Sequence, residues 1–265
     1  MRSLRSIYAV YRKEMDHYFV SPIAYVIVGV FLILTAYFFN RLLVVLIQES
    51  FEATMEGMQG GGAAAFDVPS LVMRNFFGIL STLLLFITPM LTMGIYSEER
   101  KRGTMELLMT SPITDAQIVL GKFFASLTLL ILMLLPTAGY FAYMMFHSEP
   151  TGAWKVLLST YLGALLLGSA LLALGAFFSS LTESQLIAAV LSFGAILLLW
   201  VVDFGSAAGA GAMAGALSYL SVFKHYDDFT RGVITTSNLI FYVSFIFIGI
   251  FLTIRSLDSM RWRHA

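Results

Sequence analysis

Long apolar stretches alternate with short polar ones along the chain, and this pattern predicts helices that cross a membrane. A helix needs about 20 predominantly apolar residues to span the hydrocarbon core of a bilayer. Six stretches approach this length, so we expect an all-α polytopic membrane protein with a single membrane domain over residues 1–265. The predicted spans are 23–40, 76–96, 123–146, 156–178, 186–202 and 239–254.

The first 20 residues have a different pattern. Apolar and aromatic side chains such as Ile7, Tyr11 and Met15 recur at spacings of three and four, with charged residues between them. This spacing predicts an amphipathic helix lying on the membrane surface. Ser21-Pro22 should end that helix and start the first span. We expect no cleavable signal, because charged residues precede the first apolar run and no small-residue cleavage site follows it.

Two regions between spans contain many small or acidic residues. Region 42–75 includes four acidic residues and a Gly-Ala run, which predicts a solvated outer loop; a vestibule that collects cations is the alternative. Region 204–238 begins with small residues and continues as the aromatic, amphipathic segment 217–234. The latter predicts short re-entrant helices between spans five and six. Separately, Ala164, Gly168 and Gly175 share one helix face, which permits close packing either within the chain or in a dimer.

The composition supports a membrane protein and excludes several function classes. Of the 265 residues, 58% are hydrophobic and 12% are charged, about half the charged fraction of soluble domains. The net charge of zero provides no basic surface for nucleic acid. The absence of cysteine excludes disulfides, thiolate metal sites and cysteine nucleophiles.

Lysine and arginine are distributed unequally about the six predicted spans. An even number of spans places both termini on one side, where 11 of the 16 Lys and Arg residues fall. Because positively charged loops stay in the cytosol, we expect both termini to be cytoplasmic and the protein to lie in the inner (cell) membrane.

The loop 97–122 is a charged segment between two apolar stretches. Gly103 permits a break, Thr104 can cap a short helix through its hydroxyl, and Pro112 should end that helix. So short a helix with many apolar side chains is marginal alone and must pack on something. The bilayer surface, the N-terminal helix and a groove on a soluble partner are the three possibilities.

The sequence from Glu98 to Ile113, followed by Leu120-Gly-Lys122, resembles the first cytoplasmic loop of type-2 ABC-exporter permeases. The shared pattern is an acidic pair, basic residues, Gly-Thr, an acidic residue, a leucine pair and Ser-Pro. The segment 217–234 resembles the matching part of gliding-motility-type permeases. This resemblance implies a transmembrane subunit that pairs with a second copy or a sister permease, on which two cytosolic ABC ATPase subunits dock.

The resemblance also implies roles for individual residues. Thr104 to Thr110 would form a cytoplasmic coupling helix inserted into a groove of the ATPase, with Glu98 and Glu99 at its membrane-proximal approach. Closure of the ATPases would then swing the spans between inward-facing and outward-facing states. The candidate ATPase-coupling residues are Glu98, Glu99, Arg100, Arg102, Gly103, Thr104, Met105, Glu106, Leu107, Leu108, Met109, Thr110 and Pro112.

The chain itself lacks a nucleotide-binding motif. A phosphate-binding loop needs Gly-x-x-x-x-Gly-Lys-Ser/Thr, whereas Gly121-Lys122 is followed by Phe123 and preceded by Ala116 at the first glycine position. We therefore expect no catalytic residue, cofactor or metal in this chain, and ATP and Mg on the partner ATPase.

Two other functions compete with the permease interpretation. An intramembrane hydrolase is disfavoured for two reasons. The Gly-x-Ser-Gly pattern of a rhomboid-like serine protease is not met, because Ala207 follows Ser206. In addition, all four histidines fall at interfaces or in tails and none lies within a later span. An ATP-independent secondary transporter or channel usually has ionisable residues within its spans, and the predicted span interiors contain essentially none. The aromatic residues of the spans could line a path for an amphiphilic substrate or simply form the core, so the sequence does not select a substrate.

Overall fold

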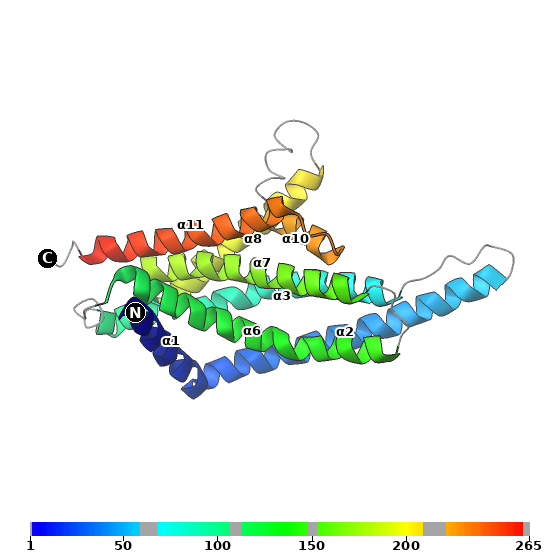
Figure 1. Cartoon of the computed structure of the whole chain (residues 1–265), viewed down its shortest axis with the longest axis horizontal. Coiled ribbons are helices and arrows are strands. Elements are labelled where there is room, and N and C mark those ends of the chain that lie inside the picture. The colour runs from blue at the N-terminus through cyan, green and yellow to red at the C-terminus, as the bar shows by residue number, and fades with distance from the viewer. Residues whose placement is uncertain (1, 59–67, 106–112, 148–152, 209–220, 262–265) are drawn as a thin grey trace.

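The computed structural model of the protein describes residues 2–58, 68–105, 113–147, 153–208 and 221–261. Each element in these segments is an α-helix (Figure 1). Six stretches are long and apolar enough to cross a membrane, which confirms the predicted all-α polytopic fold. The helices are α1 (Arg2–Val20), α2 (Pro22–Met58), α3 (Val68–Thr92), α4 (Ser97–Lys101), α6 (Asp115–His147), α7 (Ala153–Leu181), α8 (Gln185–Ala208), α10 (Val222–Thr230) and α11 (Thr236–Arg261).

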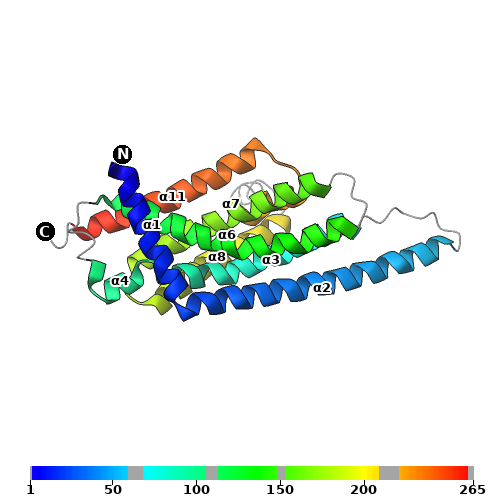
Figure 2. The same cartoon turned by 60° about the horizontal axis from the view of Figure 1, so that its bottom comes forward.

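The two ends of the chain lie at the same end of the helix bundle, which we call the terminal end (Figure 1). Here α1 crosses the bundle obliquely and packs mainly against α6 (Figure 2). Its inner face buries Val10 and Glu14, while Leu4 and Tyr8 stay exposed. As predicted, Ser21 is non-helical and Pro22 begins α2, where a proline has no helical hydrogen bond to lose.

Helix α7 is the centre of the bundle and contacts α3, α6, α8, α10 and α11. Its small residues make this possible. A Cβ atom on Gly168 would lie 2.5 Å from Leu130 of α6, and one on Gly175 would lie 2.2 Å from the hydroxyl oxygen of Thr92 on α3. The small-residue face therefore serves packing within the chain.

Aromatic side chains fill the core between α2, α3, α6 and α7. Phe76, Phe77 and Phe141 are almost completely buried, and Phe77 meets Tyr161 edge-to-face with 4.9 Å between the ring centroids. Phe39 of α2 packs on the same group, 5.4 Å from Phe141. Edge-to-face and offset pairs of this kind stabilise a core beyond their buried area. These aromatics are core residues.

The first and second spans are longer than predicted. α2 does not end at Asn40 but continues to Met58, and α3 begins at Val68. The apolar run 42–47 extends the helix past Arg41 and buries Leu46, and the following Glu, Ala and Met residues favour helix. The predicted outer loop 42–75 is therefore wrong for both described flanks, while its Gly-Ala run lies outside the described residues.

Helix α8 also differs in detail from its prediction. It begins at Gln185 with Ser184 before it, whereas Thr182 only accepts a hydrogen bond from the Ser184 N–H at 3.2 Å. The Thr182-x-x-Gln185 spacing predicts a capping box with Thr182 at the cap position, and this prediction is wrong, because Ser184 occupies that position. α8 then continues through Asp203 to Ala208.

Within the predicted re-entrant segment 217–234, the described part forms α10, far from the terminal end (Figure 1). Ser221 caps it by accepting the Lys224 N–H at 3.1 Å, and Gly232 follows with φ +79°, a conformation that favours glycine. The small-residue run 209–220 lies outside the described residues.

Candidate functional site

The charged segment of the sequence begins where the second span changes direction. α3 ends at Thr92, residues 93–96 form turns, and α4 follows as one and a half turns of helix. Gly103 then adopts φ +69°, so the predicted break at this glycine is present. The α3–α4 corner lies at the terminal end, next to α1 and the start of α8 (Figure 2).

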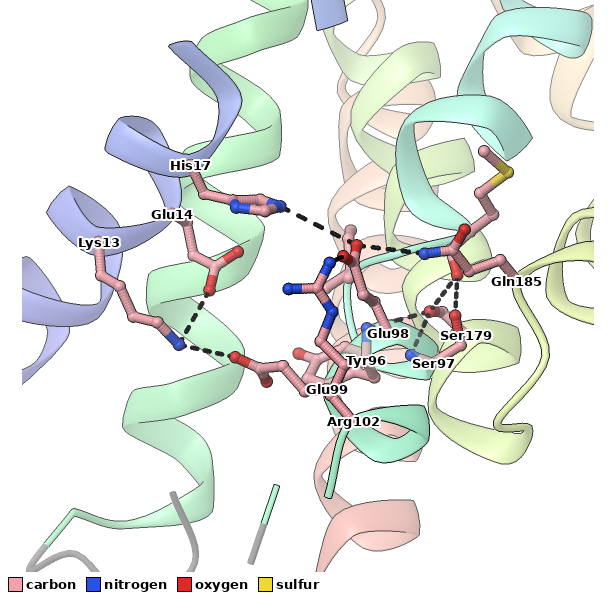
Figure 3. A network of polar contacts seen from close by, with 12 residues as sticks. Lys13, Glu14, His17, Tyr96, Ser97, Glu98, Glu99, Arg102, Ser179 and Gln185 are labelled. Carbon is pink, nitrogen blue, oxygen red and sulfur yellow. Dashed lines mark hydrogen bonds and ion pairs between the residues drawn. The ribbon is translucent and has the colours of Figure 1, made fainter. Parts of the chain in front are cut away.

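One buried serine on α7 holds this corner. The Ser179 hydroxyl accepts hydrogen bonds from the N–H groups of Tyr96 at 3.1 Å and Ser97 at 3.3 Å, and donates to the Met93 carbonyl at 3.0 Å (Figure 3). The hydrogen bonds to the two N–H groups lie in the interior, where an unpaired backbone N–H is costly. Together with the close approach of Gly175, this serine determines where the corner sits relative to α7.

A buried lysine joins α6 to α1 and α4. The Lys122 side chain is 1% exposed, and its Nζ lies 2.9 Å from Glu14 Oε1 and 3.0 Å from Glu99 Oε2. It also donates to the Ile95 carbonyl at 2.8 Å and lies 5.4 Å from the centre of the Tyr96 ring. A buried ammonium is tolerated only when its donors are satisfied and its charge is balanced. Glu14 and the Ile95 carbonyl accept hydrogen bonds from Lys122, and the carboxylates of Glu14 and Glu99 balance its charge.

Lys13 of α1 completes a neutral ion cluster with Glu14, Glu99 and Lys122. Its Nζ donates to Glu99 Oε1 at 2.7 Å and lies 3.9 Å from Glu14 Oε1. Partial burial lowers the pKa of Lys13, but the hydrogen bond to Glu99 and the two carboxylate charges outweigh this effect and raise the pKa overall. Two ammonium groups and two carboxylates thus hold α1, α4 and α6 together.

A second set of polar contacts ties α4 to the α7–α8 connection. Glu98 binds Arg102 at 2.5 Å and accepts a hydrogen bond from Gln185 at 3.1 Å (Figure 3). Arg100 donates to the Ser180 carbonyl at 2.9 Å and lies 3.3 Å from Glu183. α4 is therefore attached on two sides, to α1 and α6 through Glu99 and to α7 and α8 through Glu98 and Arg100.

The structure places part of the predicted coupling segment. Thr104 and Met105 are helical, and Met105 is buried in a small cluster with Tyr96, Ile118 and Leu257. The Thr104 hydroxyl donates to the Glu99 carbonyl at 3.3 Å. The other predicted residues, Glu106, Leu107, Leu108, Met109, Thr110 and Pro112, lie outside the described residues.

Sequence reasoning missed three residues of the site, which are Lys122, Glu14 and Ser179. The sequence places Lys122 at the end of the charged loop, but α6 begins at Asp115, so this lysine is the eighth residue of that helix. One signal was available: Glu14 follows Val10 by four residues and so shares its inward face.

The Gly121-Lys122 pair explains how α1 approaches so closely. A Cβ atom on Gly121 would lie 2.7 Å from Val10 Cβ, so only glycine lets α1 pack directly on α6 at this point. The adjacent lysine then reaches the carboxylate of Glu14. This pair, which fails the phosphate-loop pattern, is a helix-docking element.

Within the described part of the chain, no group of three or more metal-ligating side chains comes together. The polar cluster is instead filled by its own opposite charges. Its chemistry is that of a rigid joint between the surface helix α1, the membrane helix α6 and the short charged helix α4.

Comparison with known proteins identifies the family. Residues 8–256 match the family described as ABC-2 family transporter protein, which covers nearly the whole chain. A comparison with curated proteins found no significant match. This family consists of the membrane subunits that transport substrates and are not themselves enzymes, so the resemblance seen in the loop 97–122 is confirmed at the family level. With its six apolar helices and this match, the chain belongs to the ABC-2 family of transporter permeases.

Proposed function

We propose that this permease is driven by separate cytosolic ABC ATPase subunits, which bind ATP and Mg and dock on the segment 104–110. The observation that carries the proposal is the attachment of α4. This helix directly precedes the docking segment and is bonded to α1, α6, α7 and α8. A push on the segment is then passed to several membrane helices at once.

The first residues of the segment support a transfer of force from the ATPase to the membrane helices. Met105 packs against Ile118 of α6 and Leu257 of α11, close to the carboxyl end of the chain. Amphipathic helices dock into apolar grooves of partner proteins through their apolar side chains. We propose that Leu107, Leu108 and Met109 enter a groove on the ATPase.

A second permease is the other proposed partner. In each of α2, α8 and α11, less than a quarter of the apolar 18-residue stretch that could cross the membrane is buried within the chain. Lipid covers part of this surface, and a second copy or a sister permease covers another part. Export of a substrate across the membrane would take place between the two permeases, and the gliding-motility type remains the proposed subtype.

The proposed orientation places the terminal end, with α1 and α4, in the cytosol of a cell whose inner membrane holds the protein. The chain contains no cysteine, so single cysteines report position cleanly. Thr104→Cys in right-side-out vesicles should react with a membrane-impermeant maleimide only after the vesicles are opened. Lys224→Cys on α10 should react without opening. The reverse pattern overturns the orientation.

Affinity purification from the native host tests the coupling. An ABC ATPase should copurify with the wild-type chain, and Leu107→Glu with Leu108→Glu should abolish its binding because charges cannot enter an apolar groove. Lys101→Glu, a charge change on the exposed face of α4, is the matched control and should retain the ATPase. Retention of a coupled ATPase by the double variant would falsify the docking proposal.

A further inference from the structure

Three adjoining cavities lie between α1 and α4, with volumes of about 90, 490 and 610 Å³. His17 of α1 and Glu98 of α4 line all three, so the cavities are parts of one cleft. These two side chains face each other across it, with 3.9 Å between His17 Nε2 and Glu98 Oε2 (Figure 3).

The lining of the cleft is polar on one side and apolar on the other. Charged side chains of α1 and α4 form the polar mouth, and the apolar part is lined by Ile23 and Ile27 of α2 together with Met90 and Leu91 of α3. α2 is the first membrane-crossing helix and begins at Pro22. The apolar part of the cleft therefore adjoins the start of the first membrane-crossing helix, where we expect lipid headgroups to give way to acyl chains.

Some of the charged side chains at the mouth already have partners within the ion cluster. Lys13 is held by Glu99, and Glu14 is held by Lys122. The α4 wall still presents Lys101 and Arg102, while the α1 wall presents Asp16.

Arg102 retains donors for a ligand. Its side chain is 66% exposed, and its ion pair with Glu98 uses one of its terminal nitrogens. A guanidinium carries five N–H donors and suits phosphate oxygens. The cleft thus offers a phosphate site on one wall, an anionic site on the other, and an apolar channel beneath both.

We propose that this cleft binds an aminophospholipid of the bilayer. Its phosphate lies at Lys101 and Arg102, and its primary ammonium lies at Asp16 across the cleft. Its acyl chains follow Ile23 and Met90 into the membrane. A phosphatidylethanolamine headgroup matches both walls, whereas phosphatidylglycerol lacks the cation and phosphatidylcholine lacks ammonium N–H donors.

Photolabelling in vesicles tests this proposal without the ATPase. The full-length protein is reconstituted in phosphatidylcholine vesicles containing a trace of phosphatidylethanolamine with a photoactivatable acyl chain. Labelled peptides are then mapped by mass spectrometry. We expect labels near Ile23 and Met90, and unlabelled phosphatidylethanolamine should compete for the site better than phosphatidylglycerol.

Three variants probe the two zones of the cleft. Arg102→Gln and Asp16→Asn should each lower the labelling about tenfold, the effect of losing one charged hydrogen bond. Ile23→Trp should lower it by filling the apolar channel without touching the polar network. Arg231→Gln is the matched control, because Arg231 pairs with Asp227 four positions earlier at 2.5 Å, as Arg102 does with Glu98, but on α10.

The proposal is overturned when phosphatidylcholine or phosphatidylglycerol probes label the same peptides as strongly, because the cleft then holds lipid without reading its headgroup. Equal labelling of wild type, Arg102→Gln and Asp16→Asn overturns it as well. Either result leaves the docking of the ATPase untouched, since the cleft is formed within one chain.

Discussion

Lys122 and Glu14 lie 108 positions apart in the chain, yet their charged atoms are 2.9 Å apart inside the protein. This ion pair fastens the N-terminal surface helix to a membrane-spanning helix. Glu99 joins the same lysine from α4. Two of the three helices that meet here, α4 and α6, precede and follow the proposed ATPase-docking segment, so the pair would lie on the proposed path of force into the membrane.

Removing the buried lysine should destabilise the terminal end strongly. Lys122→Met removes the hydrogen-bonded partner of the buried Glu14 and leaves only Lys13, 3.9 Å away, and breaking a buried pair in this way costs about 3–5 kcal/mol. We expect a clear fall in the thermal unfolding temperature of the detergent-solubilised protein. Lys155→Met, at an exposed lysine on α7, is the control and should unfold near the wild-type temperature.

A double variant separates the ion pair from general damage. Glu14→Gln combined with Lys122→Met removes both charges, so it should be more stable than Lys122→Met alone. The changes in unfolding free energy of the two single variants should not add up to that of the double variant, because residues in contact are coupled. Strict additivity would show that these side chains do not interact.

The hydroxyl of Ser179 should contribute far more to the stability of the α3–α4 corner than the hydroxyl of Ser180. Ser179→Ala leaves the buried N–H groups of Tyr96 and Ser97 without an acceptor, at about 1–3 kcal/mol. Hydrogen exchange of residues 93–101 should rise. Ser180→Ala is the control, because the Ser180 hydroxyl donates to the Phe177 carbonyl of its own helix and the carbonyl that binds Arg100 is unchanged by the substitution. Equal effects of the two variants would contradict the assigned role of Ser179.

Two glycines of α6 should respond in opposite ways to alanine. At Gly121 a Cβ would lie 2.7 Å from Val10, so Gly121→Ala should push α1 away and cost about 1–3 kcal/mol. At Gly139 the space is open, so Gly139→Ala should be neutral or slightly stabilising through its helix propensity. Limited proteolysis of α1 measures the difference, and protection of α1 in Gly121→Ala would show that the contact is unimportant.

The ion pair of Lys13 predicts a dependence on alkaline pH. Its pKa is raised in the folded protein, so its stabilising contribution is fully present below the unfolded value of about 10.4. This contribution is lost as the pH rises through the folded pKa. Proteolytic release of α1 should increase over that window in the wild type, and the increase should be smaller in Lys13→Gln. An identical alkaline profile for both proteins would refute this assignment.

Local pattern was enough for much of the architecture. The run of apolar residues predicted six spans, the three-four spacing predicted α1, and Ser21-Pro22 and Gly103 predicted the breaks that the structure shows. Each of these features depends on neighbours within a few positions, which the sequence displays directly. In region 42–58, helix-forming residues continue past the apolar run that defines the first span. There the same local reasoning ended the predicted helix too early.

The tertiary structure alone decided which charges are inside. Nothing within a few residues of Lys122 shows that Glu14, Glu99 and the Ile95 carbonyl will surround it, because these partners come from α1, from α4 and from the turn before α4. The same holds for Ser179 at the α3–α4 corner and for the glycines of α7, whose neighbours are set by helix packing. Sequence determined that a charged segment leaves the membrane at residue 97. Packing between helices far apart in the chain determined what that segment is attached to.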